Sequence, residues 1–260
     1  MTPEPTADPR MLGFNDAHVW FARLDVDPST LQEWQLLLSA DERSRAARFL
    51  RAADANRFVA SRASLRLLLS TYVGTAPADL RFEYSPQGKP ELAGAGRPGL
   101  RFKLSHSGDL AMVGLAREKR VGVDVEKVRP ETVTDGLARD IMSAAEFRTF
   151  SLLPTEQRVE AFFNCWTRKE AFLKARGDGL ACPLNEVEVT FAPGSEPRLV
   201  RAPGESEPSV DWLVSQFQPV SEYVAAIAIE GRDANISRWI MPSRLADLGA
   251  NILCWENISW

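Results

Sequence analysis

The sequence predicts an α+β fold in the form of a pseudo-dimer, with two similar α+β lobes and a cleft between them. Two observations support this prediction. Runs with the two-residue alternation of strands are interleaved with longer stretches whose apolar residues recur at helical spacing. The order of strand, capped helix and long helix then occurs a second time, which divides the chain into lobes at 17–119 and 120–234.

The first lobe begins with residues 18–26, whose alternation is typical of a strand. Residues 39–50 open with the capping-box pattern Ser-Ala-Asp-Glu, which predicts a helix. Residues 56–73 carry apolar side chains at helical spacing, and Gly74 ends this second helix. The lobe is completed by a strand at 80–84, a tight turn at 86–90, a loop at 94–99 and paired strands at 102–104 and 110–116.

The second lobe follows the same order. Residues 120–128 are strand-like, residues 143–146 form another capping-box pattern, and residues 158–176 predict a long helix that ends at Gly177. The other elements expected here are strands at 187–191 and 212–229, separated by a Pro/Gly/Glu-rich loop at 192–209.

The likeness of the two halves extends to single residues. The segment 62–66 can be laid on 170–174, so that Arg62 takes the place of Glu170. Capped helices resemble one another, however, so a true duplication and a chance likeness are both compatible with the sequence.

Both ends of the chain lie outside the two lobes. Residues 1–16 predict a flexible N-terminal arm, and residues 235–260 form a Trp-rich extension with Trp239, Trp255 and Trp260. We expect this extension to pack on the second lobe, because aromatic side chains usually enter cores.

Composition excludes several classes of protein. The net charge of −4 argues against a general nucleic-acid binder, so any anionic ligand must be held by a local basic cluster. Three cysteines without a Cys-x-x-Cys motif predict a reducing compartment. Residues 1–10 lack the pattern of a secretory signal, and the richest apolar run, 224–229, is too short to span a bilayer. We therefore expect a cytoplasmic protein.

Two carboxylates share one face of the strand at 120–128. Successive side chains of a strand point to opposite faces, so Asp124 and Glu126 lie on one face and Val123 and Val125 on the other. Neighbouring carboxylates raise each other's pKa unless a cation lies between them, and Mg²⁺ prefers such oxygen ligands. The alternative is a polar strand face in contact with solvent.

The long helix of the second lobe carries a further carboxylate. Trp166, Glu170 and Lys174 are four residues apart and form one stripe. Glu170 and Lys174 are either an exposed ion pair or, respectively, a third metal ligand and a contact for a metal-bound phosphate.

Other candidate phosphate contacts are spread along the first lobe. Ser105 and His106 lie where a strand becomes a turn, although His106 is equally compatible with a purely local role. Lys89 and the pair Arg62 and Arg66, which share a helix face, are basic candidates, while most arginines of the first two helices are expected to face solvent. A Ser/His/Asp hydrolase is disfavoured by the absence of Gly-x-Ser-x-Gly, and a zinc site by the lack of suitably spaced His and Cys residues.

Taken in order, four motifs resemble those of the Sfp-type 4'-phosphopantetheinyl transferase family. They are Gly88-Lys-Pro90, Leu104-Ser-His-Ser107, Gly122-Val-Asp-Val-Glu126 and Trp166-Thr-Arg-Lys-Glu170-Ala-Phe-Leu-Lys174, the last followed by Ala-x-Gly177-x-Gly179-Leu180. The resemblance covers about residues 18–230. It implies two α+β lobes with coenzyme A in the cleft between them, and transfer of the phosphopantetheine arm of coenzyme A to a serine of a carrier protein.

The resemblance also implies roles for single residues. It makes Asp124, Glu126 and Glu170 the Mg²⁺ ligands, with Glu170, Lys174 and His106 as the catalytic residues. The implied coenzyme-A contacts are Arg45, Arg62, Gly88, Lys89, Ser105, His106 and Lys174. Two positions depart from the family pattern: Lys103 replaces a frequent Asn, and Glu42 stands where some relatives have a basic residue.

The expected mechanism is attack of the carrier serine on the β-phosphorus of coenzyme A, with Glu170 taking the proton and adenosine 3',5'-bisphosphate leaving. One alternative is a Mg²⁺-dependent phosphohydrolase, which would release phosphate without a carrier. Another is a protein that binds coenzyme A without catalysis, whose affinity for coenzyme A would not depend on Mg²⁺. The length and two-lobe organisation favour a monomer of the broad-acceptor type. The carrier serves fatty-acid, polyketide or non-ribosomal peptide synthesis, and the sequence does not distinguish these.

Overall fold

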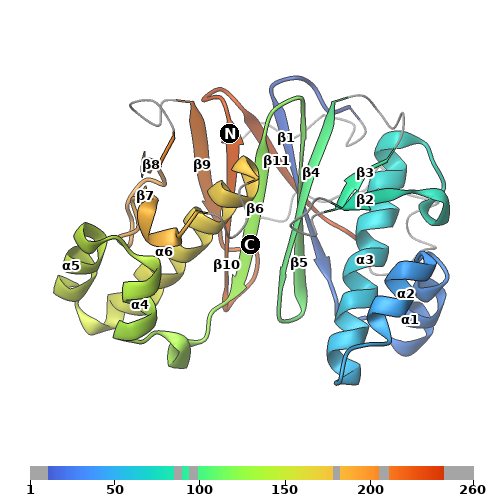
Figure 1. The fold of residues 1–260 in the computed structure, drawn as a ribbon, viewed down its shortest axis with the longest axis horizontal. Coiled ribbons are helices and arrows are strands. Elements are labelled where there is room, and N and C mark those ends of the chain that lie inside the picture. Colours follow the sequence, from blue (N-terminus) through green and yellow to red (C-terminus); the bar gives the residue numbers. More distant parts are fainter. Residues whose placement is uncertain (1–10, 85–89, 94–98, 178–181, 205–210, 243–260) are drawn as a thin grey trace, which may run out of the picture.

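Two sheets pack face to face, and each carries one long helix on its outer side (Figure 1). The structure, a computed structural model, describes residues 11–84, 90–93, 99–177, 182–204 and 211–242. The layers run helix, sheet, sheet, helix, which confirms the prediction of a mixed α+β protein.

The first sheet contains four strands and is covered by α3 (Ala52–Val73). Its order is β11 (Asn235–Ile240), β1 (Asp16–Arg23), β5 (Leu110–Arg117) and β4 (Leu100–Ser107). β1 and β4 are antiparallel to β5, whereas β11 runs parallel to β1.

The second sheet contains three strands and is covered by α6 (Thr155–Arg176). Its antiparallel order is β6 (Val121–Lys127), β10 (Tyr223–Glu230) and β9 (Trp212–Phe217). The order β1-β5-β4 of the first sheet therefore matches the order β6-β10-β9 of the second.

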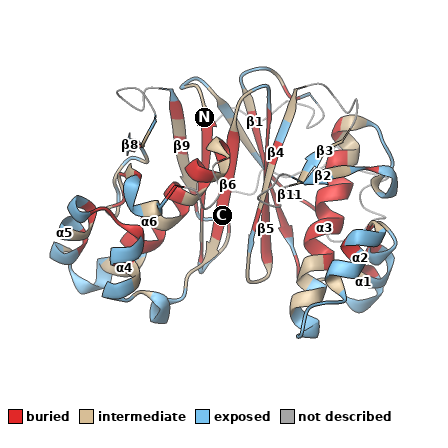
Figure 2. Ribbon diagram, in the orientation of Figure 1, coloured by how far each residue is buried: buried red, intermediate tan, exposed pale blue. Residues whose placement is uncertain are grey.

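Strand alternation fills three cores. In β1, Val19 and Phe21 point toward the second sheet and pack in the cluster that contains Val123 and Ile227. Trp20, on the opposite face, packs in the cluster under α3. A third cluster lies between the second sheet and α6. Figure 2 shows that the central strands and the inner faces of both long helices are buried.

Four predicted helix signals are confirmed. Ser39 caps α2 (Ala40–Ala46) and Ser143 caps α5 (Ala144–Leu152), each with a complete capping box. Both long helices end at a glycine in the left-handed region, Gly74 with φ 71° and Gly177 with φ 92°. Glycine reaches this region at little cost, which explains why both helices end there.

Each capping-box glutamate forms an ion pair with a buried basic side chain from the long helix of its own half. Glu42 pairs with Arg66 at 2.7 Å, and Glu146 pairs with Lys169 at 2.5 Å. The same cations donate to the first carbonyls of two 3₁₀ turns, η1 (Pro77–Asp79) and η4 (Leu184–Glu186). These contacts match Arg66 with Lys169, so the register that laid Arg62 on Glu170 is wrong.

Several short elements were not predicted. α2 ends at Ala46 rather than near residue 50, and β8 (Leu199–Arg201) lies inside the stretch expected to be a loop. Other unpredicted elements include α1 (Pro28–Gln35), β3 (Pro90–Leu92), η2 (Pro130–Thr132), α4 (Asp135–Ile141), β11 and the turns η1 and η4. β3 pairs with β2 (Phe82–Tyr84), and β8 pairs with β7 (Glu188–Val189). Each pairing involves only two or three residues, too few to give a clear periodic pattern.

The expectation for the C-terminal extension was wrong in one respect. Trp239, only 4% exposed, lies in β11 and stacks on Trp20 with 4.9 Å between ring centroids. It therefore packs in the core of the first sheet and not on the second lobe. Trp255, Trp260, residues 1–10, most of the turn at 86–90, and residues 94–98 of the expected loop lie outside the described residues.

The described helices include two of 22 residues, α3 and α6. Neither of these nor any other described helix combines the length and the apolarity that a bilayer crossing requires.

Candidate active site

The edge strands of the two sheets, β4 and β6, lie beside each other at the centre of the molecule (Figure 1). Serines of β4 bond to carboxylates of β6 across this seam. Ser105 Oγ donates to Asp124 Oδ1 at 2.9 Å, and Ser107 Oγ donates to Glu126 Oε2 at 2.7 Å. Because Ser105 and Ser107 are two residues apart, they share the strand face that Asp124 and Glu126 meet.

Gly122 lets α6 approach β6 closely enough to bring in a third side chain. A Cβ at this position would lie 2.1 Å from the Ala171 carbonyl oxygen and 2.2 Å from the Ala175 nitrogen. With the helix so close, Lys174 Nζ lies 2.5 Å from Asp124 Oδ1 and 3.0 Å from Ser105 Oγ. The structure thus brings together Ser105, Asp124 and Lys174.

Burial and like charge govern the carboxylates. Burial, followed by the neighbouring charge of Asp124, raises the pKa of Glu126 to about 7. Burial lowers the pKa of Lys174, but the charges of Asp124, Glu170 and Glu126 and the hydrogen bond to Asp124 outweigh burial and raise that pKa above its usual value. Glu170 therefore contributes to the same electrostatic cluster as the strand carboxylates.

The carboxylate oxygens of the site suit a hard cation, and Lys174 contacts only Oδ1 of Asp124. Within the described part of the chain, no three His, Cys, Asp or Glu side chains are grouped to hold a metal ion as they stand. Asp124 Oδ2, however, is buried and has no hydrogen-bond partner among the described residues. A buried carboxylate oxygen without a partner is unfavourable, so the residue chemistry of Asp124 and Glu126 fits Mg²⁺.

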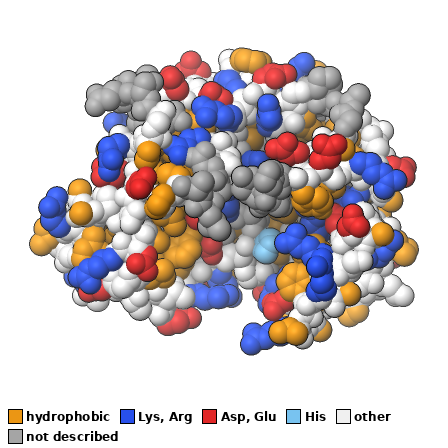
Figure 3. Space-filling view, viewed as in Figure 1, with side chains coloured by type: hydrophobic (Ala, Val, Ile, Leu, Met, Phe, Trp, Pro, Cys, Tyr) orange, Lys and Arg blue, Asp and Glu red, His pale blue; other side chains and the backbone are white. Residues whose placement is uncertain are grey.

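A pocket of about 640 Å³ opens beside this cluster, between α3 and the seam. Its walls are mostly basic and aromatic, and include Arg45, Arg57, Arg62, Lys103, Lys174, Phe49, Phe58, Tyr84 and Phe102. In Figure 3 the hollow at the front of the molecule holds a histidine side chain, with Lys and Arg side chains close to it. This surface suits an anion with an attached ring.

His106 lies in this pocket, on the face of β4 opposite to Ser105. Solvent reaches the imidazole, but the pocket wall removes part of its hydration. This burial, followed by the charges of Lys174 and Arg45, lowers the pKa of His106. His106, Lys174 and Arg45 thus line one pocket.

Arg62 also lines the pocket, but it has an acidic partner. Its guanidinium lies 2.5 Å from Glu42 Oε1 and donates to the hydroxyl of Tyr84 at 3.2 Å. Glu42, which replaces a basic residue of some relatives, therefore binds two arginines, Arg62 and Arg66. A phosphate contact by Arg62 stays a prediction. Gly88 and Lys89 lie outside the described residues.

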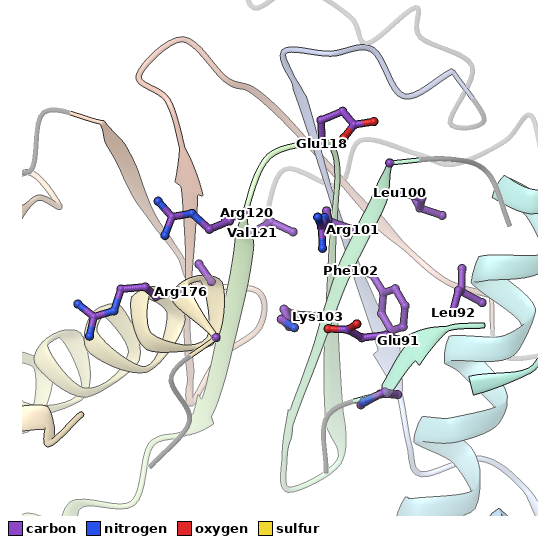
Figure 4. Close-up of a pocket in the computed structure, with 14 residues that line it drawn as sticks. Glu91, Leu92, Leu100, Arg101, Phe102, Lys103, Glu118, Arg120, Val121 and Arg176 are labelled. Carbon is purple, nitrogen blue, oxygen red and sulfur yellow. The ribbon is translucent and has the colours of Figure 1, made fainter. Parts of the chain in front are cut away.

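A second cavity, of about 520 Å³, lies farther along the seam, and Lys103 borders both. Figure 4 shows Lys103 and Glu91 near each other in this cavity, whereas the guanidinium groups of Arg120 and Arg176 extend away from it. Arg120 bonds Glu230, and Arg176 donates to the Pro203 carbonyl. Arg120 and Arg176 therefore contribute less positive charge to this cavity than a count of its basic residues would indicate.

Ser107 is a functional candidate that sequence reasoning missed. It belongs to the Leu-Ser-His-Ser motif, yet only Ser105 and His106 were given roles. The two-residue spacing from Ser105 is the signal that would have found it, since it places both hydroxyls on one strand face.

Comparisons with known proteins agree with this geometry. The model of the 4'-phosphopantetheinyl transferase superfamily matches residues 120–228. A second model, described as 4'-phosphopantetheinyl transferase, N-terminal, matches residues 27–119. Together the two matches cover both long helices and both strands of the seam, β4 and β6, but not β1 or β11 of the first sheet.

Curated relatives match most of the chain. The 4'-phosphopantetheinyl transferase HetI of Nostoc sp. is 37% identical over 84% of this chain and 89% of that protein. The putative 4'-phosphopantetheinyl transferase slr0495 of Synechocystis sp. is 32% identical over 90% of this chain and 84% of that protein. Among solved structures, the holo-[acyl-carrier-protein] synthase of Thermotoga maritima covers 43% of this chain and 62% of its own, with 26% identity and a TM-score of 0.34.

Proposed function

The chain belongs to the 4'-phosphopantetheinyl transferase family, and on that premise we propose that it moves the phosphopantetheine arm of coenzyme A to a serine of an acyl or peptidyl carrier protein. The product is the holo carrier, and adenosine 3',5'-bisphosphate is released. The observation that carries the proposal is the contact of Lys174 with both Asp124 and Ser105, beside a basic and aromatic pocket.

The pocket between α3 and the seam would receive the nucleotide of coenzyme A. Its aromatic walls suit the adenine ring, and Arg45 and His106 suit the phosphates. Arg62 would offer a further charge, although Glu42 neutralises part of it. Lys103 would add a cation where many relatives have Asn.

Asp124, Glu126 and Glu170 would hold the Mg²⁺ ion. When bound, Mg²⁺ would supply positive charge to the pyrophosphate of coenzyme A. The buried, unpartnered Asp124 Oδ2 supports this assignment.

The chain's own side chains would carry the proton and charge movements. Glu170 accepts the proton of the carrier serine, whose oxygen then forms a bond to the β-phosphorus. The bond from the β-phosphorus to the bridging oxygen breaks, and that oxygen leaves on adenosine 3',5'-bisphosphate. Lys174 and His106 stabilise the negative charge that develops on the phosphates.

The activity is tested by mass spectrometry of several apo carriers after incubation with coenzyme A and Mg²⁺. We expect the mass of each accepted carrier to increase by one phosphopantetheine group. Release of inorganic phosphate without a carrier would indicate a phosphohydrolase instead. Coenzyme-A binding that is indifferent to Mg²⁺, with no transfer, would indicate a binding protein without activity.

The role of Glu170 is tested by Glu170→Ala in the same assay, with Glu160→Ala as the control. Glu160 lies on the same helix but is exposed, so its removal tests the general cost of losing one negative charge from α6. We expect the Glu170 variant to lose at least about a hundredfold in rate, the lower end of what general base catalysis supplies. Transfer at the rate of the unchanged protein would remove Glu170 from the mechanism.

We further propose that the two halves arose by duplication and that the active site lies in the cleft between them. The matched strand orders and the paired contacts Glu42–Arg66 and Glu146–Lys169 support this. We also propose a cytoplasmic monomer. Size-exclusion chromatography with light scattering tests the oligomeric state.

A further inference from the structure

The corner that joins β4 to β5 is a two-residue turn beside the active site. Ser107 pairs with Leu110, so Gly108 and Asp109 form the turn itself. Gly108 has φ +54°, a value that favours glycine at the first position of such a hairpin turn. The residues just before it, His106 and Ser107, are the ones that reach the pocket and the carboxylates.

Asp109 is held by three different elements. Its carboxylate accepts a hydrogen bond from Arg57 Nε of α3 at 2.8 Å. Its carbonyl accepts one from the backbone nitrogen of Leu24, just after β1, at 2.8 Å. Its own backbone nitrogen donates to the hydroxyl of Tyr223 at 3.0 Å. Elements of both lobes therefore form hydrogen bonds with Asp109.

Tyr223 provides the hydrogen bond from the second lobe. It lies at the start of β10, is 7% exposed, and pairs with Lys127 of β6. A Cβ on Gly108 would lie 2.6 Å from the Tyr223 hydroxyl oxygen, so the hydroxyl packs directly on the turn. This contact fixes the position of the turn relative to Asp124 and Glu126 of β6.

The turn carries two groups that depend on this position. Ser107 Oγ accepts from the Lys127 backbone nitrogen at 3.2 Å and donates to Glu126 Oε2 at 2.7 Å. His106 faces the pocket with Lys174 and Arg45. A shift of the turn therefore moves both the imidazole and the hydroxyl that orients Glu126.

We propose that Asp109 and Tyr223 are positioning residues, which hold the His106–Ser107 corner in register with Glu126 and Lys174 so that coenzyme A and its cation bind productively. This inference rests on the proposed function of the site. Neither residue need touch the reacting atoms.

Tyr223→Phe removes the hydroxyl and keeps the ring, and Asp109→Ala removes the contact with Arg57. Each change removes one part-buried hydrogen bond, which corresponds to an effect of roughly two- to tenfold. We expect each variant to lower kcat/KM for coenzyme A by about that factor or more. The KM for the carrier protein should change less than about twofold, because the carrier need not contact the turn. Asp109→Asn keeps an oxygen acceptor for Arg57 and should recover most of the loss.

The control is Glu230→Ala, which breaks the ion pair with Arg120. Side-chain exposures in that pair are 41% and 40%, against 37% and 40% for Arg57 and Asp109, so the two pairs are alike in exposure. The Arg120 pair does not touch the turn. Glu230→Ala should therefore lower Tm as much as Asp109→Ala does, but leave kcat/KM for coenzyme A unchanged.

A second readout does not depend on catalysis. NMR titration of His106 in the full-length protein should give a pKa closer to the ordinary value of histidine in Tyr223→Phe than in the unchanged protein, because a displaced turn leaves the pocket wall. Unchanged kcat/KM and an unchanged His106 titration in both variants would overturn the proposal. If the unchanged protein transfers nothing to any carrier, the proposed function fails, and the titration still decides whether Asp109 and Tyr223 position the corner.

Discussion

Glu126 shows how a single half-buried carboxyl group lowers the stability of the folded protein at high pH. Its carboxyl is held by Ser107 and lies near Asp124, and its pKa is raised from 4.5 to about 7 by burial and by that neighbour. Below about pH 4.5 the residue is protonated in both the folded and the unfolded chain, so it has no effect on stability. Between about 4.5 and 7 the unfolded chain loses its proton first, and the folded state is progressively destabilised. Above about 7 the penalty is constant.

We therefore predict that Glu126→Gln stabilises the metal-free protein at pH 8 and leaves it unchanged near pH 4. The shift corresponds to on the order of 3 kcal/mol at most, or several degrees in Tm. Calorimetric melting across this pH range in the presence of a chelator checks the prediction. An increase in Tm of equal size at both pH values would mean that Glu126 is not the group responsible.

Lys174 competes with a metal ion for Asp124, since its ammonium already lies 2.5 Å from that carboxylate. We predict that Lys174→Met binds Mg²⁺ more tightly than the unchanged protein when no coenzyme A is present, by roughly tenfold, because about 1.4 kcal/mol of competition is removed. Transfer activity should fall at the same time. Titration calorimetry with Mg²⁺ measures the first effect.

The matched control for this change is Lys127→Met. Lys127 lies next to Glu126 in sequence and pairs weakly with Glu222 at 3.9 Å, so its loss changes the local charge equally without freeing Asp124. Equal gains in Mg²⁺ affinity for both variants would show a general electrostatic effect and no competition at Asp124.

At the level of single residues, the sequence predicted which side chains would meet but not how they pair. Strand alternation placed Asp124 and Glu126 on one face, and helical spacing placed Glu170 beside Lys174. The pairing of Arg62 with Glu42 was not predictable, because it joins a capping-box residue to a helix 20 residues later through the packing of α2 on α3.

At the level of the elements, the close approach of α6 to β6 depends on Gly122, which has no side chain. A Cβ on Gly122 would overlap backbone atoms of Ala171 and Ala175, which cannot move without the helix. We predict that Gly122→Ala destabilises the protein by about 3 kcal/mol or more and reduces activity beyond the loss of folded protein, since Glu170 and Lys174 move with α6. Chemical denaturation and activity per folded molecule check both parts.

Gly136→Ala is the control for this substitution. Gly136 lies in α4, and a Cβ there would meet nothing closer than Thr134 Oγ1 at 3.9 Å. Stability should change by less than about 1 kcal/mol, in the direction of greater stability, because alanine is the better helix former. A similar loss in both variants would contradict the close-approach explanation.

The elements predicted well are those with a signal inside their own sequence. The capping boxes at Ser39 and Ser143 and the terminal glycines Gly74 and Gly177 marked helices that the structure confirms. β11 has no such signal, because its identity as a strand comes from hydrogen bonds to β1, a partner about 219 residues away. Local patterns do not encode a pairing over that distance.

At the scale of the whole molecule, the two halves depend on each other. The inner faces of the sheets share one apolar cluster, to which Val19 and Met112 contribute from the first half and Val123 and Ile227 from the second. We predict that a fragment of residues 1–119 does not fold alone, since it would expose this face and lack β11. Circular dichroism and amide hydrogen exchange of the fragment check the prediction.

Trp239 provides the corresponding test in the intact chain. Trp239→Ala should cost about 3–5 kcal/mol, because the ring packs on Trp20 and His18 in the core of the first sheet. A stable, cooperatively melting 1–119 fragment, or a neutral Trp239→Ala, would mean that the first half is independent of the end of the second.

The parallel pairing of β1 with β11 also determines when the protein can finish folding. The ribosome makes β11 more than 200 residues after β1, since Asp16 pairs with Asn235, so β1 emerges with one edge still without its partner. Closing it joins the most distant described parts of the chain, the kind of contact that slows folding. Completion of the first sheet therefore waits for the synthesis of β11, and a nascent chain that stalls before residue 235 exposes an unpaired strand edge, which is a site for pairing with other chains.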